Sequence, residues 1–163
     1  MIAAVPTVYI LIGVQGSGKS TWARANAERL KAVILASDEV RNELEAEGMD
    51  ATGKGDLVFG IVEQRLGQWL AQGQNVIVDA THARRRWREK EIAVARAHGA
   101  KVIAVWLDTP LAVCLERNQH KPGGPRWGER VVPEQVLLGV ARGFEAPEAG
   151  EFHEVWHLRI DEL

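Results

Sequence analysis

The 163-residue sequence has a single cysteine, no long apolar run and no excess of either charge. Cys114 cannot form an internal disulfide, and no metal-ligand spacing surrounds it, as expected in a reducing compartment. No apolar run approaches the ~20 residues that cross a bilayer, and residues 1–6 lack the basic start and cleavage pattern of a signal peptide. The sequence therefore predicts a soluble, cytoplasmic protein without a membrane partner.

The 20 Lys and Arg residues nearly balance the 22 Asp and Glu residues, which leaves a formal net charge of −2. This balance excludes a global basic field, so any bound nucleic acid would be held locally and over a short span. With 46% hydrophobic residues, the chain can bury a core without disulfides. We expect one domain over residues 1–163, and the composition indicates no particular oligomeric state.

Short apolar runs alternate with stretches of helical period along the chain. This alternation predicts an α/β fold with a parallel sheet of about five strands and helices on both faces. The expected strands are 8–12, 33–36, 76–79, 102–107 and, with a weaker pattern, 155–158. The expected helices are 19–30, 38–47, 57–72, 84–98, 110–118 and 133–144, the last with proline in its first turn.

The segment Gly13-Val14-Gln15-Gly16-Ser17-Gly18-Lys19-Ser20 follows the first expected strand and fits the phosphate-binding loop (P-loop) pattern G-x-x-x-x-G-K-[ST]. The glycines let consecutive backbone N–H groups point at one anion, and the following helix adds its positive end. Lys19 is expected to reach the β- and γ-phosphates of a nucleotide and Ser20 to hold Mg²⁺. The predicted nucleotide-binding residues are Gly13, Gln15, Gly16, Ser17, Gly18, Lys19, Ser20 and Thr21.

Asp38 and Arg41 follow the second expected strand, at the edge where open α/β sheets place their sites. If a helix begins at Asp38, the two side chains share one helix face and point into the same cleft. In a kinase, the carboxylate would accept the proton of an attacking hydroxyl while the arginine holds an acceptor phosphate or the transferring group. The alternative is a helix-capping residue with a surface ion pair one turn later.

Asp79 ends the third expected strand and fits the carboxylate that holds Mg²⁺ through a water in P-loop proteins. The alternative is a strand-end residue that caps the next turn. Thr81, His82 and Arg85 follow at the mouth of the expected cleft and are candidates for contact with an acceptor.

The densest basic run is Arg84-Arg85-Arg86-Trp87-Arg88. Such a run could hold a phosphodiester while Trp87 stacks on a base. It is equally typical of a solvated helix face with one tryptophan turned inward.

Residues 119–132 are expected to form an arginine-bearing lid. The segment 123–125, Gly-Gly-Pro, supplies hinges, and Arg126 and Arg130 lie four residues apart. Phosphoryl transfer needs positive charge in its transition state, and a closing lid would also exclude water. Trp127 could cover the nucleotide base or the acceptor. The alternative is an exposed loop whose arginines are solvated.

Together these motifs resemble the P-loop polynucleotide 5′-hydroxyl kinases of the phage T4 type and the small kinases related to them. The likeness covers most of the chain. Besides the P-loop, the Asp-x-x-Arg pair and the lid, it includes the strand end 76–81 and the tail from 132–134 through 144–147.

The resemblance implies roles for individual residues. It implies that ATP is the donor, that Asp38 is the general base and that Arg41 contacts the phosphate next to the acceptor hydroxyl. It also implies that Arg126 and Arg130 grip the nucleotide phosphates, and these residues with Lys19 make up the predicted catalytic set.

The first hypothesis is therefore an ATP- and Mg²⁺-dependent kinase that phosphorylates a hydroxyl acceptor, the 5′-hydroxyl of a nucleic acid. The alternative is a small-molecule kinase that uses the same machinery on a metabolite, sugar or antibiotic hydroxyl. The slightly acidic balance of charges favours this alternative modestly, because the basic residues that could hold a polymer are few and local. A third hypothesis is a nucleotide-dependent regulator without transfer activity, which would leave Asp38 without a catalytic task.

Overall fold

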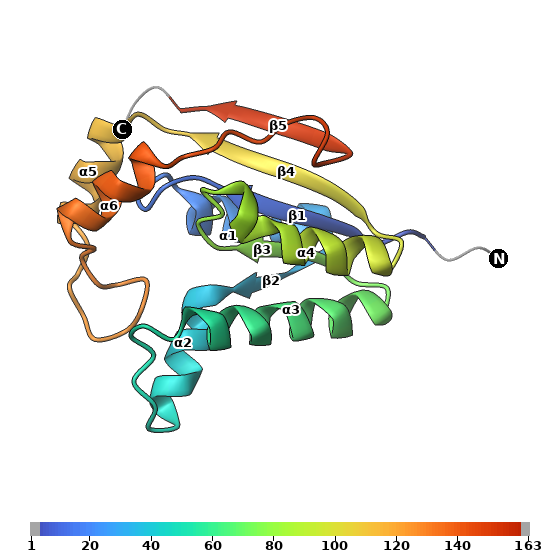
Figure 1. Ribbon diagram of the computed structural model, residues 1–163, viewed down its shortest axis with the longest axis horizontal. Coiled ribbons are helices and arrows are strands. Elements are labelled where there is room, and N and C mark those ends of the chain that lie inside the picture. The colour runs from blue at the N-terminus through green and yellow to red at the C-terminus, as the bar shows by residue number, and fades with distance from the viewer. Residues whose placement is uncertain (1–3, 161–163) are drawn as a thin grey trace.

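Five parallel strands form one sheet, in the order β2-β3-β1-β4-β5, in the computed structural model, which describes residues 4–160 (Figure 1). Six helices accompany the sheet within the described residues. The strands are β1 (Thr7–Ile12), β2 (Ala32–Ala36), β3 (Asn75–Asp79), β4 (Lys101–Asp108) and β5 (Glu154–Arg159). The helices are α1 (Lys19–Leu30), α2 (Ser37–Ala46), α3 (Gly55–Ala71), α4 (Arg85–Ala97), α5 (Leu111–Gln119) and α6 (Glu134–Arg142).

The predicted α/β fold is confirmed, and each expected strand and helix is present with ends shifted by at most about two residues. Pro133 differs slightly from the prediction, because it is the N-cap of α6 and the helix begins at Glu134. Gly73 and Gly99, each two residues after a helix, have φ angles of 77° and 68°, as expected of glycines that end helices.

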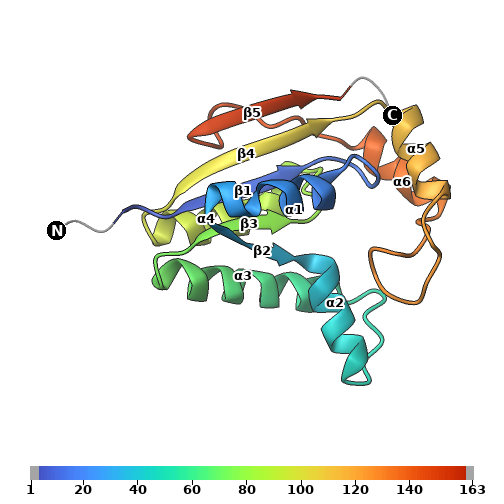
Figure 2. The same cartoon turned by 180° about the vertical axis from the view of Figure 1, so that it is seen from behind.

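Helices cover both faces of the sheet and create two hydrophobic clusters. On one face, α2, α3 and α4 pack on inward side chains of β1, such as Ile10, through residues such as Val62 and Ile92 (Figure 1). On the other face, α1 packs through Ala23 on the alternate side chains of the same strands, such as Leu11 (Figure 2). Because the central strands β1, β3 and β4 are mostly buried on both faces, they are largely apolar, whereas the edge strands β2 and β5 are more exposed.

The carboxyl ends of the strands meet at one edge of the sheet, the edge toward which the arrows point and where α5 and α6 lie (Figure 1). β1 lies between β3 and β4, and its register aligns Ile10 with Val78 and Ala104. The loops after β1 and β3 therefore emerge side by side. This is the crevice in which open parallel sheets bind ligands.

Within residues 4–160, the longest and most apolar helices still fall short of what is needed to cross a membrane.

Candidate functional site

The loop between β1 and α1 has the backbone shape of a phosphate cradle. Gly16 and Gly18 adopt φ angles of 84° and 102°, a region that favours glycine. A Cβ on Gly16 would lie 2.6 Å from the carbonyl oxygen of Cys114, so a larger residue would clash there. No side chain caps the first turn of α1, and the buried Ser17 hydroxyl has no partner within the described residues. These donors fit a phosphate group.

Lys19 supplies the charge of this cradle. Its ammonium group donates hydrogen bonds to the carbonyl oxygens of Gly13 at 2.9 Å and Val14 at 3.0 Å. Burial lowers the pKa of Lys19 to about 8, although the nearby carboxylates of Asp79 and Asp38 oppose this effect. A phosphate beside the ammonium group would favour its charged form.

The two predicted metal-binding residues lie in direct contact. Ser20, in the first turn of α1, donates a hydrogen bond from its hydroxyl to Asp79 Oδ2 at 2.7 Å. Asp79 is the last residue of β3 and is buried. A hydroxyl and a carboxylate beside a phosphate cradle are the oxygen ligands that Mg²⁺ takes in P-loop proteins, so these residues fit the ion. Within residues 4–160, no cluster of three His, Cys, Asp or Glu side chains forms a protein-only metal site.

Residues far along the chain hold the cradle from the side of α5. Arg117 donates to the carbonyl oxygen of Gly16 at 3.2 Å, and Thr109 donates to that of Ser17 at 2.8 Å. Both contacts join segments more than 90 residues apart in the sequence. Nothing in the local sequence pattern indicated these partners.

Asp38 and Arg41 lie together at the start of α2, as predicted. β2 passes directly into α2, which places Asp38 in the first turn. Arg41 donates to Asp38 Oδ1 at 3.1 Å, and their side chains are 18% and 46% exposed. The carboxylate thus stays accessible while the guanidinium is mostly covered. Both residues line the same cleft as Lys19.

This cleft has a volume of about 2040 Å³, above the ~300–1,000 Å³ of a typical single-ligand pocket. It therefore has room for a nucleotide and an acceptor together. Beyond Asp38, its walls include the cleft-facing residues Phe59 and Glu63 of α3 and Lys90 of α4. Sequence reasoning missed these three residues. The one available signal was the spacing of four between Phe59 and Glu63, which also fits an ordinary amphipathic helix.

The lid residues rest on α2 in this structure. Arg126 pairs with Glu39 at 3.4 Å on the surface, and Arg130 pairs with Glu45 at 2.6 Å. Both arginines also line the cleft. Trp127 likewise contacts α2, on the side of the cleft that contains Asp38. The contact of Arg126 and Arg130 with nucleotide phosphates stays a prediction.

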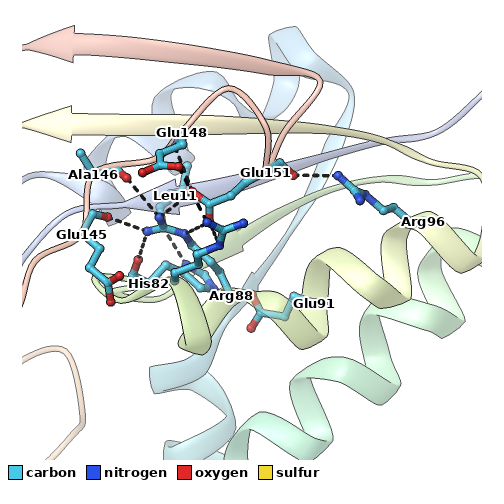
Figure 3. Close-up of polar contacts among 10 residues, drawn as sticks. Leu11, His82, Arg88, Glu91, Arg96, Glu145, Ala146, Glu148 and Glu151 are labelled. Carbon is cyan, nitrogen blue, oxygen red and sulfur yellow. Dashed lines mark hydrogen bonds and ion pairs between the residues drawn. The ribbon is translucent and has the colours of Figure 1, made fainter.

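The arginines of the basic run 84–88 lie in different environments. Arg88 is fully buried and forms a two-fold ion pair with Glu151, with nitrogen–oxygen distances of 2.9 and 3.0 Å (Figure 3). Arg85 lies near Glu148 and Glu151, and Arg84 packs over Trp87 at 5.3 Å. Of the arginines in this run, only Arg86 lines the cleft, and no ion pair within residues 4–160 involves it.

His82 lies at the cleft, as expected, but both nitrogens of its ring contact the protein itself. His82 is 2% exposed, and its Nδ1 and Nε2 face the carbonyl oxygen of Leu11 and the carboxylate of Glu91 (Figure 3). A carbonyl oxygen and a carboxylate both accept, so the charged imidazole, which donates from both ring nitrogens, satisfies both contacts. Burial alone would lower the pKa of His82, but Glu91 outweighs it and raises the pKa above its usual value. His82 therefore holds the turn after β3 in place through its contacts with Leu11 and Glu91.

A known family model, AAA_33, described as an AAA domain, matches residues 8–147, the span that contains the cradle, Asp38, Asp79 and the lid. The chain belongs to the AAA_33 family. This assignment does not single out the polynucleotide kinases that the motifs resemble.

Curated proteins and solved structures similar to this AAA_33 chain include several kinases. The adenylyl-sulfate kinase of Escherichia coli is 29% identical over 147 residues, which are 86% of this chain and 70% of that protein. A proposed kinase from Chloroflexus aurantiacus has a TM-score of 0.77 at 18% identity, covering 97% of this chain and 89% of its own. A chain of the Pnkp1/Rnl/Hen1 RNA repair complex has a TM-score of 0.72 at 21% identity, over 87% of this chain and 45% of its own. These similarities show that the chain shares the fold of P-loop kinases.

Proposed function

We propose that this AAA_33 protein is an ATP- and Mg²⁺-dependent phosphotransferase in which Asp38 activates the hydroxyl of a small acceptor. The observation that carries this proposal is the position of Asp38 and Arg41 in the same cleft as the phosphate cradle. A regulator that only bound a nucleotide would need no carboxylate facing the cradle. The partly exposed Asp38, held beside a covered arginine, suits a base that must meet an incoming alcohol.

In the proposed reaction, the cradle and Lys19 bind the β- and γ-phosphates of ATP. Mg²⁺, held by Ser20 and by Asp79 through a water, would supply further positive charge to the phosphate oxygens. Asp38 accepts the proton of the acceptor's hydroxyl group as the hydroxyl oxygen bonds to the γ-phosphorus. The bond between that phosphorus and the β–γ bridging oxygen breaks, and ADP leaves.

The lid arginines complete this proposal. Arg126 and Arg130 would balance the charge that spreads over the γ-phosphoryl group in the transition state. To reach the phosphate oxygens, Arg126 would leave Glu39 and Arg130 would leave Glu45. The Arg126–Glu39 pair is exposed, and exposed ion pairs contribute about 0–1 kcal/mol, so the exchange costs little for Arg126.

The charges around the acceptor side favour a small molecule over a polymer. There, α2, α3 and α4 bring both signs of charge to the cleft, and most of the basic run 84–88 is engaged elsewhere. A polymer site would need a track of cations along the backbone. On these three helices, the carboxylates that line the cleft are Asp38, Glu39, Asp56 and Glu63, and the cations that line it are Arg41, Arg86 and Lys90.

The names of several similar proteins agree with a small acceptor. They include kinases named for adenylyl sulfate, gluconate and shikimate. The second candidate acceptor is the 5′-hydroxyl end of a nucleic acid. It is favoured by the Asp38–Arg41 pair, since an arginine beside the base suits the phosphate next to a terminal hydroxyl, and by the similarity to the Pnkp1-containing complex.

Transfer from γ-labelled ATP to a panel of small alcohols, nucleosides and 5′-hydroxyl oligonucleotides tests the proposal. We expect label in a small alcohol or nucleoside, with a KM that depends weakly on salt. Preferential labelling of oligonucleotides, with an affinity that falls steeply as salt rises, would support the second candidate. ATP binding without transfer to any acceptor would support the third hypothesis, a regulator.

A further inference from the structure

The guanidinium of Arg41 lies between two aromatic rings from different parts of the chain. Its central carbon is 5.7 Å from the ring centre of Phe59 in α3 and 5.1 Å from that of Trp127 in the lid. Both distances fall within the ~6 Å range of cation–π attraction. The rings and the bond to Asp38 together fix the direction in which Arg41 can donate.

Trp127 is held in this position by contacts with α2. Its backbone N–H donates to Asn42 Oδ1 at 2.7 Å, and its carbonyl oxygen accepts from Asn42 Nδ2 at 3.2 Å. The indole N–H donates to Glu45 Oε2 at 2.9 Å. Arg130 covers the ring at 4.3 Å and also pairs with Glu45. These contacts define a lid seat formed by Asn42 and Glu45.

The lid seat also brings the lid close to the proposed base. Gly128 has a φ of 90°, and a Cβ built on it would lie 3.7 Å from Asp38 Oδ2. The lid backbone therefore passes beside the reactive carboxylate. Phe59 packs against the hydrophobic cluster that α2, α3 and α4 form on the sheet, whereas Trp127 belongs to neither cluster. Packing of the core therefore accounts for the place of Phe59 but not for that of Trp127.

We propose that Trp127 and Phe59 are positioning residues that orient Arg41 toward the acceptor, so that seating of the lid on α2 completes the acceptor site. This inference rests on the proposed function, because it takes Arg41 to be an acceptor contact. It assigns Trp127 to the acceptor side of the cleft and not to the nucleotide base. One lid then serves both substrates, with arginines for the phosphates and a tryptophan for Arg41.

The position of Arg41 can be tested without any activity. A proton near the face of a ring resonates at lower frequency, so the Arg41 Nε–Hε NMR signal should move downfield in Trp127→Leu and in Phe59→Leu. The signal is assigned by its loss in Arg41→Lys. Trp87→Leu removes an exposed indole that contacts Arg84 and should leave the signal in place. An Arg41 signal that moves in neither Trp127→Leu nor Phe59→Leu would overturn the proposal.

The consequence for binding is tested with the best acceptor of the panel. Losing one cation–π contact should raise the acceptor KM about 3- to 10-fold in Phe59→Leu, with the KM for ATP unchanged. Phe59→Tyr keeps the aromatic ring and should have the acceptor KM of the wild type. A merely structural role of Phe59 would not require an aromatic ring. An unchanged acceptor KM in Phe59→Leu would contradict the positioning role. If no acceptor is labelled at all, the proposed function fails while the NMR test still decides whether the rings orient Arg41.

Discussion

The Ser20 hydroxyl donates a hydrogen bond to Asp79 Oδ2 at 2.7 Å and so joins the start of α1 to the end of β3. This contact brings together the two residues predicted to hold Mg²⁺. We expect Asp79→Asn to lower the Mg²⁺-dependent part of ATP affinity about 10- to 100-fold, as for residues that hold a metal through a water. Calorimetric titrations with and without Mg²⁺ measure that part.

Asp108 provides a matched control, because it ends β4 as Asp79 ends β3 and pairs with His157 instead. Asp108→Asn should leave ATP affinity unchanged. An equal loss for Asp79→Asn with and without Mg²⁺ would show that Asp79 supports the cradle and does not serve the metal.

Lys19 predicts a proton uptake when the nucleotide binds. Its pKa of about 8 means that roughly half of the free molecules carry a neutral Lys19 at pH 8. A triphosphate favours the charged form, so binding without added metal should take up about half a proton at pH 8 and less at pH 7. Calorimetry in buffers with different ionisation enthalpies measures this number.

In Lys19→Met the uptake should disappear and ATP affinity should fall. The exposed Lys54 serves as the control, because Lys54→Met should leave the proton uptake and the ATP affinity unchanged. An uptake that persists in Lys19→Met would assign the proton to another group.

The buried Arg88–Glu151 pair predicts a loss of stability in acid. Burial alone would raise the pKa of Glu151, but hydrogen bonds from Arg88 and from the Glu148 backbone N–H outweigh it and hold the pKa below its usual range. The stabilisation is therefore present above the unfolded pKa of ~4.3 and is lost as pH falls through the folded pKa. Glu151→Gln should lower the free energy of unfolding at pH 7 by about 3 kcal/mol and flatten its decline in acid.

Urea unfolding at several pH values measures this dependence. Glu148 is a suitable control, because its side chain is 75% exposed. Glu148→Gln should change stability by less than about 0.5 kcal/mol. A Glu151→Gln variant as stable as the wild type at pH 7 would show that the pair contributes no net stability.

The lid seat predicts protection from trypsin. Removing the two Asn42 hydrogen bonds should destabilise the seated lid relative to the open lid by about 1–3 kcal/mol. Cleavage after Arg126 and Arg130 should then be roughly tenfold faster in Asn42→Ala, since cleavage follows the open population. Gln64→Ala, at an exposed position of α3, removes an equivalent amide and should leave the rate unchanged. Equal rates in Asn42→Ala and the wild type would mean that the lid is not held by α2.

The sequence predicted the parts of the site whose partners are close together along the chain. Strand, loop and helix are consecutive around Gly16 and Lys19, so the P-loop pattern was sufficient. Asp38 and Arg41 lie three residues apart on one helix, so their contact followed from helical geometry.

Contacts between distant segments could not be predicted in this way. The seat of Trp127 on Glu45 joins residues 82 positions apart, and the pair of Arg88 with Glu151 joins residues 63 positions apart. The basic run shows the difficulty most clearly. Its composition indicated positive charge, but only tertiary structure shows that Arg88 is buried in a stabilising pair while Arg86 faces the cleft.

The most direct test of the account is the rate of γ-phosphoryl transfer by Asp38→Asn, measured together with its ATP affinity. A general base contributes about 10²- to 10⁴-fold to the rate, so we expect kcat to fall by that factor while ATP affinity stays within about twofold of the wild type. Asp56→Asn, which also lines the cleft, is the matched control for the loss of one carboxylate and should retain far more activity. Transfer by Asp38→Asn at the wild-type rate would contradict the central claim that Asp38 activates the acceptor.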